Sequence, residues 1–199
     1  MSMIHVMAEA TLYGPPPTDH QIERASVFLD YIPASLRTRP GRLSTQLSSR
    51  QAEMLGYMMR HQGEKLTAVK EAGVTEGTFD NYLSFANKEL GTFVVDQAIV
   101  VAEHHGYIAP FDTYNITAVA TRPPTEAQLV VMQGLAFILN TSAIARILDV
   151  PERTVTAHIP RAYKRVGCPS HRSALIAWGV QNDYILTARR FLGHEGKYC

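Results

Sequence analysis

The chain has 199 residues, of which 46% are hydrophobic and 19% are charged, with a formal net charge of +1, and this composition suits one large or two small globular domains. Its two cysteines, Cys168 and Cys199, are too few for a disulfide framework, and the absence of an 18-residue apolar run predicts no membrane span. The opening residues lack the pattern of a signal peptide, so we expect a cytoplasmic protein.

Residues 1–46 are predicted to form an N-terminal extension with one amphipathic helix over residues 19–32, capped by Thr18 or Asp19. One face of this helix is apolar and needs a partner surface. That face comprises Ile22, Ala25, Phe28, Leu29 and Ile32. Three arginines follow, at positions 37, 39 and 42. They belong either to a solvated linker or to an arm that lies along DNA phosphates or in a minor groove.

Residues 47–108 are predicted to form a first domain of four helices. Ser48 and Gln51 have the spacing of a capping box at the start of its first helix. A short second helix starts near Leu66, and the third lies within residues 74–91, "VTEGTFDNYLSFANKELG". This domain carries five basic and eight acidic residues, a net charge of about −3 that disfavours contact with DNA.

The fourth helix of this domain ends near His104 and His105, which we expect to interact with its C-terminal dipole. The helix is apolar on more than one face. A four-helix domain of this size buries only part of such a surface. We therefore predict that this helix packs against the N-terminal helix, against the second domain, or against a second copy of the chain.

Residues 109–123 are predicted to be a linker, with a short extended segment over 116–120. Residues 124–186 are predicted to form a second domain, and residues 187–199 a C-terminal tail. Thr125 and Gln128 repeat the capping-box spacing. Residues 124–199 carry nine basic and five acidic residues, and this net charge of about +4 favours a nucleic-acid partner.

The two domains contain an internal repeat. Residues 150–167, "VPERTVTAHIPRAYKRVG", align without a gap on residues 74–91, 76 positions earlier. Glu76 matches Glu152, Gly91 matches Gly167, and the apolar stripe of a helix recurs in the same phase. Two copies of one helical unit are therefore predicted.

The stretch "TVTAHIPRAYKRVGCPSHRSALIAWGVQNDYI" resembles the LuxR/GerE-type helix-turn-helix family, and "LSSRQAEML", residues 47–55, resembles the opening helix of that family. The resemblance implies an all-α fold with two tandem four-helix helix-turn-helix domains and an N-terminal helical extension. It also implies that the third helix of a unit enters the major groove and that the fourth supports dimers.

The resemblance and the helical phase together predict the DNA-contacting residues. In the second domain they are Arg153, Thr154, Thr156, Ala157, Arg161, Lys164 and Arg165, and in the weaker first domain they are Asn81 and Lys88. The chain departs from the family pattern at Thr156 and Pro160, where basic residues are common. A proline inside a helix costs roughly 3 kcal/mol and bends it. We predict a bend that directs the later basic residues toward phosphates; the alternative is a helix that has lost its DNA-reading role.

These observations predict a transcriptional regulator with no sensor domain that binds double-stranded DNA, alone or as a homodimer. The alternative is an adaptor or anti-activator that binds another transcription regulator or RNA polymerase, which the acidic first domain and an exposed Phe85 favour. No catalytic residue, cofactor or metal site is predicted. His158 and Cys168 are expected to be packed, and the terminal His194, Glu195 and Cys199 match no established metal-ligand spacing.

Overall fold

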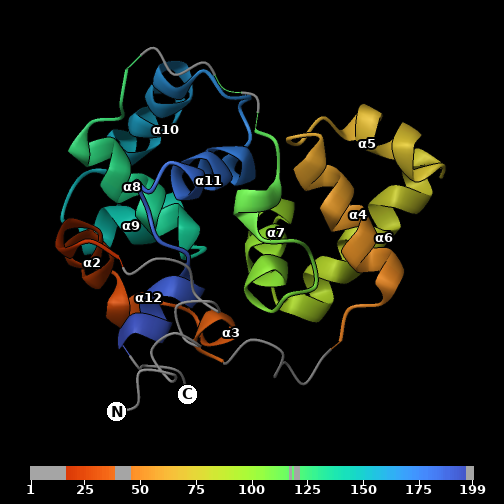
Figure 1. Ribbon diagram of the computed structural model, residues 1–199, viewed down its shortest axis with the longest axis horizontal. Coiled ribbons are helices and arrows are strands. Elements are labelled where there is room, and N and C mark those ends of the chain that lie inside the picture. The colour runs from red at the N-terminus through yellow and green to blue at the C-terminus, as the bar shows by residue number, and fades with distance from the viewer. Residues whose placement is uncertain (1–16, 39–45, 117, 119–121, 196–199) are drawn as a thin grey trace, which may run out of the picture.

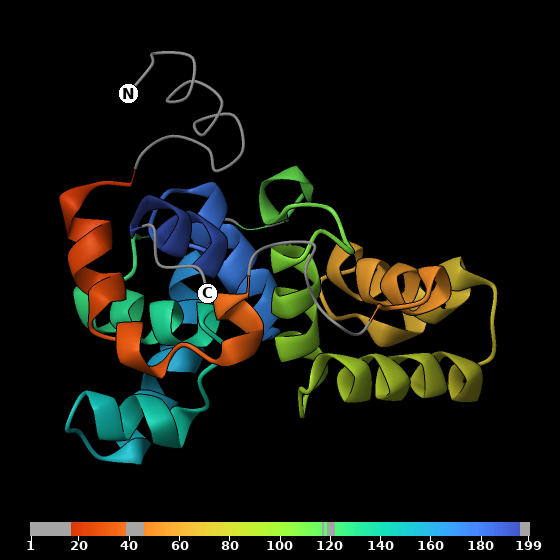
Figure 2. The same cartoon turned by 90° about the horizontal axis from the view of Figure 1, so that it is seen from below.

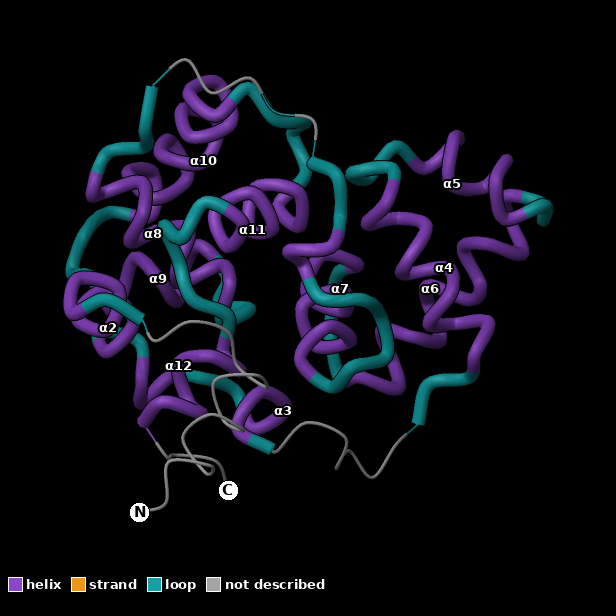
Figure 3. Tube along the Cα trace, in the orientation of Figure 1, coloured by secondary structure: helices purple, strands orange, loops and turns teal. Residues whose placement is uncertain are grey.

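The computed structural model describes residues 17–38, 46–116, 118 and 122–195. Figure 3 shows these residues as helices joined by loops, with no strand among them. The all-α fold class predicted from the sequence is therefore confirmed. None of the described helices is long and apolar enough to cross a membrane.

Residues 17–38, which we call the N-terminal segment, contain three short elements: α2 (Asp19–Ser26), the 3₁₀ turn η1 (Leu29–Tyr31) and α3 (Ala34–Arg37). The prediction of one continuous helix over 19–32 was wrong. Helix α2 ends at Ser26, and Phe28 has left the helical region, with φ of −102° and ψ of 0°. Pro33 accounts only for the last residue of the predicted range, because Ile32 precedes it and is extended, with ψ of 123°. The apolar face is nevertheless used, since Ala25, Phe28 and Ile32 are buried.

Four helices follow and form the first helical group: α4 (Ser49–Arg60), α5 (Lys65–Ala72), α6 (Glu76–Leu90) and α7 (Val95–His104). The predicted capping box is present, since the Ser48 Oγ accepts from the Gln51 N–H and the Gln51 Oε1 accepts from the Ser48 N–H. Helix α4 contacts the other three helices of the group.

The second helical group comprises α8 (Glu126–Ala136), α9 (Thr141–Ile147), α10 (Glu152–Val166) and α11 (Arg172–Gln181). Its bounds repeat those of the first group: α6 and α10 both have 15 residues and both end at a left-handed glycine, Gly91 and Gly167. Lys65 bonds to Glu76 in one group, and Thr141 bonds to Glu152 at the matching positions of the other. The repeat in the sequence therefore has a structural counterpart.

Two segments outside these groups differ from the predictions. Residues 187–199 were expected to be a tail, but Ala188–Glu195 form α12, which buries Phe191 and Leu192 and contacts α3. The segment 109–123 contains the 3₁₀ turn η2 (Phe111–Thr113), and Phe111 is buried. The Gln181 side chain donates to the carbonyls of Phe111 and Tyr114, at 2.8 and 2.6 Å. These bonds and the burial of Phe111 fix this segment to α11.

Helix α7 stands between the rest of the first group and the second group (Figures 1 and 2). It contacts α4 and α6 on one side and α11 and α3 on the other. The Asp96 Oδ1 of α7 accepts from the Ser173 N–H at the start of α11, at 3.0 Å, and the Gln97 Nε2 donates to the Ile138 carbonyl at 2.8 Å. Of the three partners predicted for this helix, the second group is the one observed.

Candidate nucleic-acid interface

Helix α10 has one buried and one solvent-facing side. Its buried stripe is Val155, Ile159, Ala162 and Val166, as the sequence predicts. The helix continues through Pro160 without a break, and Pro160 itself is exposed. On the exposed side, solvent can satisfy the carbonyl that the proline leaves without a helical donor. The opposite face of α10 is therefore presented to solvent along its whole length.

The predicted DNA-contacting residues of this helix lie outside the buried stripe. Arg153, Thr156, Arg161 and Lys164 are exposed, whereas Thr154, Ala157 and Arg165 are half-buried. Within the described part of the chain, the three cations Arg153, Arg161 and Lys164 form no hydrogen bond or ion pair. Arg165 differs, because its guanidinium donates to the Pro123 carbonyl at 2.9 Å. Helix α10 thus offers three unpaired positive charges to a partner.

A groove of about 620 Å³ runs between the start of α8 and helix α10. We call it the basic groove, and it is lined by Arg122, Thr125, Gln128, His158, Arg161, Lys164 and Arg165. No carboxylate of the described residues lines it. Four cationic side chains gathered in one groove, with no carboxylate among its described lining residues, create a positive potential that attracts an anion.

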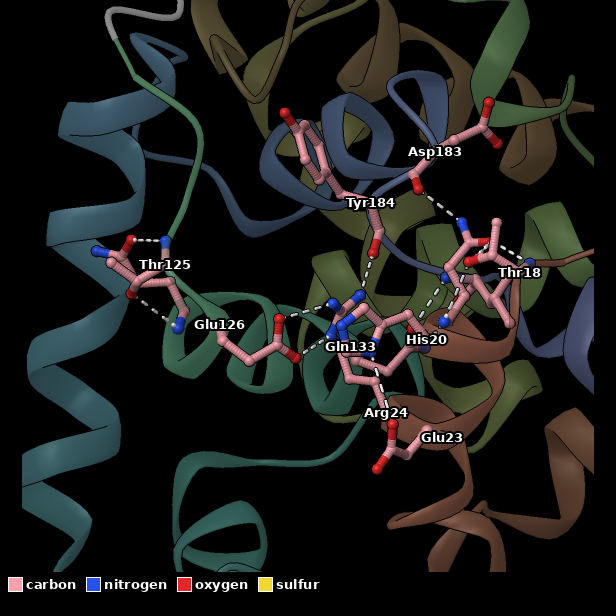
Figure 4. A network of polar contacts seen from close by, with 12 residues as sticks. Thr18, His20, Glu23, Arg24, Thr125, Glu126, Gln133, Asp183 and Tyr184 are labelled. Carbon is pink, nitrogen blue, oxygen red and sulfur yellow. Dashed lines mark hydrogen bonds and ion pairs between the residues drawn. The ribbon is translucent and has the colours of Figure 1, made fainter.

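The acidic residue that lies nearest in sequence to the basic groove is neutralised by an ion pair with the N-terminal segment. Glu126, in the first turn of α8, accepts two hydrogen bonds from Arg24 of α2, at 2.8 and 2.9 Å. Arg24 is only 7% exposed and also donates to the Tyr184 carbonyl (Figure 4). Its hydrogen bonds hold the pKa of Glu126 below its usual value. The N-terminal segment therefore lowers the negative charge beside the groove.

The first helical group lacks this surface. Asn81 and Lys88 are exposed on α6, as predicted. The acidic start of that helix is paired, since the Lys65 Nζ lies 2.8 Å from carboxylate oxygens of both Glu76 and Asp80. At the positions matching His158, Arg161 and Arg165, 76 residues earlier, the chain has Tyr82, Phe85 and Glu89. The structure therefore does not combine Asn81 and Lys88 into a basic face.

The structure corrects the predicted roles of several basic residues near the N-terminal segment. His104 and His105 are buried, and their Nε2 atoms bond to the carbonyls of Thr38 and Ser35, at 3.0 and 2.7 Å. Burial lowers the pKa of His104 to about 4, so at neutral pH it carries no charge for a helix dipole. Arg37 is half-buried in α3 and donates to the carbonyls of Leu29 and Ile32, so it is not part of a solvated linker.

Other predicted residues have the expected burial or lie outside the described residues. Cys168 is buried, and burial raises the pKa of its thiol to about 11, as expected of a packed side chain. His158 is half-buried, and His194 is exposed. Arg39, Arg42 and Cys199, the side chain of Glu195 and most of the segment 116–120 lie outside the described residues. No cluster of potential metal ligands occurs among the residues that the structure describes.

Sequence reasoning missed two contributors to the basic groove. Arg122 was assigned to the linker, and Gln128 was recognised only as a capping residue. The available signal was their position: Arg122 lies three residues before Thr125, and a helix start is a favourable place for an anion. Comparisons with protein-family models, with curated proteins and with solved structures find no match for this chain.

Proposed function

We propose that this protein is a cytoplasmic DNA-binding transcriptional regulator whose second helical group contacts double-stranded DNA through α10. The observation that carries the proposal is a set of three exposed cations on α10, Arg153, Arg161 and Lys164. They have no partner among the described residues, and they lie beside a groove that no described carboxylate lines. Neutralisation of phosphates by such cations supplies most of the free energy of nonspecific DNA binding.

The exposed face divides into two sets of contacts. Arg153, Thr156 and Ala157 lie in the first half of α10, the half that contacts base edges in helix-turn-helix proteins. An arginine recognises guanine, and an alanine methyl contacts the thymine methyl. Arg161 and Lys164 lie further along and border the basic groove, where contacts to phosphates fix the orientation of the duplex.

A salt titration of labelled duplex DNA tests this proposal. We expect a steep fall of affinity with salt, and replacement of both Arg161 and Lys164 by alanine reduces the slope by roughly 0.9 for each lost contact. This double variant weakens binding to all sequences. The Arg153→Ala change instead relaxes preference at one base pair, at a cost of about 1–3 kcal/mol.

Lys88→Ala is the matched control, because Lys88 occupies the position of Lys164 in the first group and is also exposed. We expect it to leave the affinity unchanged. Absence of binding to any duplex at low salt would overturn the proposal. If replacing Lys88 lowered DNA affinity more than replacing Lys164, the first group and not the second would be the one that contacts DNA.

A second candidate function is an adaptor that binds another transcription regulator or a polymerase subunit. Phe85, at the position of Arg161, is 56% exposed, and Phe93 is 93% exposed. Exposed aromatic side chains are enriched at protein interfaces. This function predicts that the intact protein recovers such a partner from extract after nuclease treatment. It further predicts that Phe85→Ser and Phe93→Ser abolish the recovery without altering DNA affinity.

A further inference from the structure

The basic groove has features of a site for a small anion that duplex binding alone does not require. Its side chains come from three places: Arg122 before α8, Thr125 and Gln128 at the start of α8, and His158, Arg161, Lys164 and Arg165 on α10. The Arg165–Pro123 hydrogen bond holds the segment that carries Arg122 beside α10. The groove is therefore held together by contacts within the protein.

Two polar groups in its wall have unused hydrogen-bonding capacity. Gln128 is only 3% exposed, and its Oε1 accepts from the Thr125 N–H at 2.8 Å. Its Nε2 has no acceptor among the described residues. The buried Nδ1 of His158 also lacks a partner there. Among the described residues, the Nε2 of Gln128 is a donor still available to a ligand, whereas the Nδ1 of His158 is a buried polar atom without a partner.

The start of α8 adds a third source of attraction. The first N–H groups of a helix have no partners within the helix, and the dipole makes this end positive. The only carboxylate in the first turn, Glu126, is bonded to Arg24. A tetrahedral oxyanion in the groove can accept hydrogen bonds from the helix start, the glutamine amide and the cationic side chains.

We propose that the basic groove binds a phosphate group, either the terminal phosphate of a small organic ester or a phosphate of a nucleic-acid strand. Lys164 and Arg122 supply charge, and the Nε2 of Gln128 donates to a phosphate oxygen. The volume of about 620 Å³ lies within the range of pockets that hold small molecules. The site adds to the proposed function and does not depend on duplex reading.

Isothermal titration calorimetry of the full chain tests this site with inorganic phosphate, adenosine 5′-monophosphate and adenosine. We expect the first two to bind and uncharged adenosine not to bind. Lys164→Gln and Arg122→Gln each weaken phosphate binding about tenfold, the loss expected for one charge-assisted hydrogen bond. Lys88→Gln, at the matching position of the first group, leaves the affinity unchanged. Thermal melting of each variant verifies that it folds.

The results separate this site from the proposed function. Duplex binding without binding of phosphate or the monophosphate would overturn the site and leave the proposed function standing. Phosphate binding without duplex binding would support the site and overturn the proposed function. Equal affinity in the intact protein and in both groove variants would also overturn the site. Tighter binding of the monophosphate than of inorganic phosphate identifies a small ester as the source, whereas displacement of inorganic phosphate by duplex alone identifies the nucleic-acid strand.

Discussion

Two adjacent buried residues near the end of α7, Glu103 and His104, have pKa values shifted in opposite directions. Burial raises the pKa of Glu103 to about 7, and the charge of Arg189 partly opposes this shift. Burial lowers the pKa of His104 to about 4, and its hydrogen bond to Thr38 partly opposes that shift. Burial therefore disfavours the charged form of both residues near the junction of α7, η2 and α3.

These shifts predict how stability depends on pH. Because the pKa of Glu103 is about 7 when folded and 4.5 otherwise, its contribution is present at low pH and is lost as the pH rises through 7. The contribution of His104, whose pKa falls from 6.5 to about 4, is present at high pH and is lost as the pH falls. The two effects offset each other over the shared range, which conceals the effect of Glu103 in the intact protein.

Glu103→Gln separates the two effects, because glutamine does not ionise. We expect the melting temperature of this variant, relative to that of the intact protein, to rise between pH 5 and pH 8. Melting curves across this range provide the measurement. Glu64→Gln, at an exposed position, is the control and gives a constant difference. A constant difference for Glu103→Gln as well would show that burial does not control its ionisation.

Helix α7 is the element that joins the two helical groups. Its apolar residues Ala98, Ile99, Val100, Val101 and Ala102 are all buried, although an amphipathic helix covering one core buries only one stripe. The other faces are buried because α11 and α3 pack against them. Packing within one chain thus accounts for the apolar residues on more than one face of α7.

A charge introduced into this helix is expected to destabilise the protein strongly. Val101 is completely buried, so Val101→Glu places a carboxylate without a partner in the core, at a cost of roughly 3 kcal/mol or more. Chemical denaturation measures this loss. Val94→Glu is the matched control, because Val94 precedes the same helix and is 46% exposed. Equal effects of the two changes would show that α7 is not buried between the groups.

At the scale of the whole molecule, the two helical groups are in direct contact at Gly63 and His171. Gly63 has a positive φ of 86°, and a Cβ atom there would lie 2.0 Å from the His171 ring. Gly73 has a similar φ of 66°, but apart from its chain neighbours no described residue has an atom within 4 Å of its Cβ position. Both glycines therefore adopt a left-handed backbone conformation, but only Gly63 has the side chain of another residue against its Cβ position.

This pair yields a prediction about the contact between the groups. Gly73→Ala incurs only the strain of the left-handed conformation, about 1–2 kcal/mol. Gly63→Ala incurs a similar strain and also displaces His171, the residue that precedes α11. We expect a larger loss of stability for Gly63→Ala, together with faster hydrogen exchange at the start of α11. Similar losses of stability for both variants would show that the His171 ring does not lie against Gly63.

The sequence alone determined the features that depend on neighbouring residues. The capping boxes at Ser48 and Thr125, the left-handed glycines Gly91 and Gly167, and the buried stripe of α10 all follow from hydrogen bonds or periodicity within a few positions. The exposure of Arg153, Arg161 and Lys164 follows from the same periodicity, because the apolar stripe fixes which side of the helix faces outward.

The tertiary structure alone decided which distant segments meet. Arg24 and Glu126 are 102 positions apart, and Arg165 and Pro123 are 42 apart; no local pattern signals either contact. Helix α12 packs against α3, which comes from the other end of the chain. The basic groove arises for the same reason, because its residues are brought together by the packing of α10 against α8. Packing depends on the shapes of complete surfaces, which a single stretch of sequence does not contain.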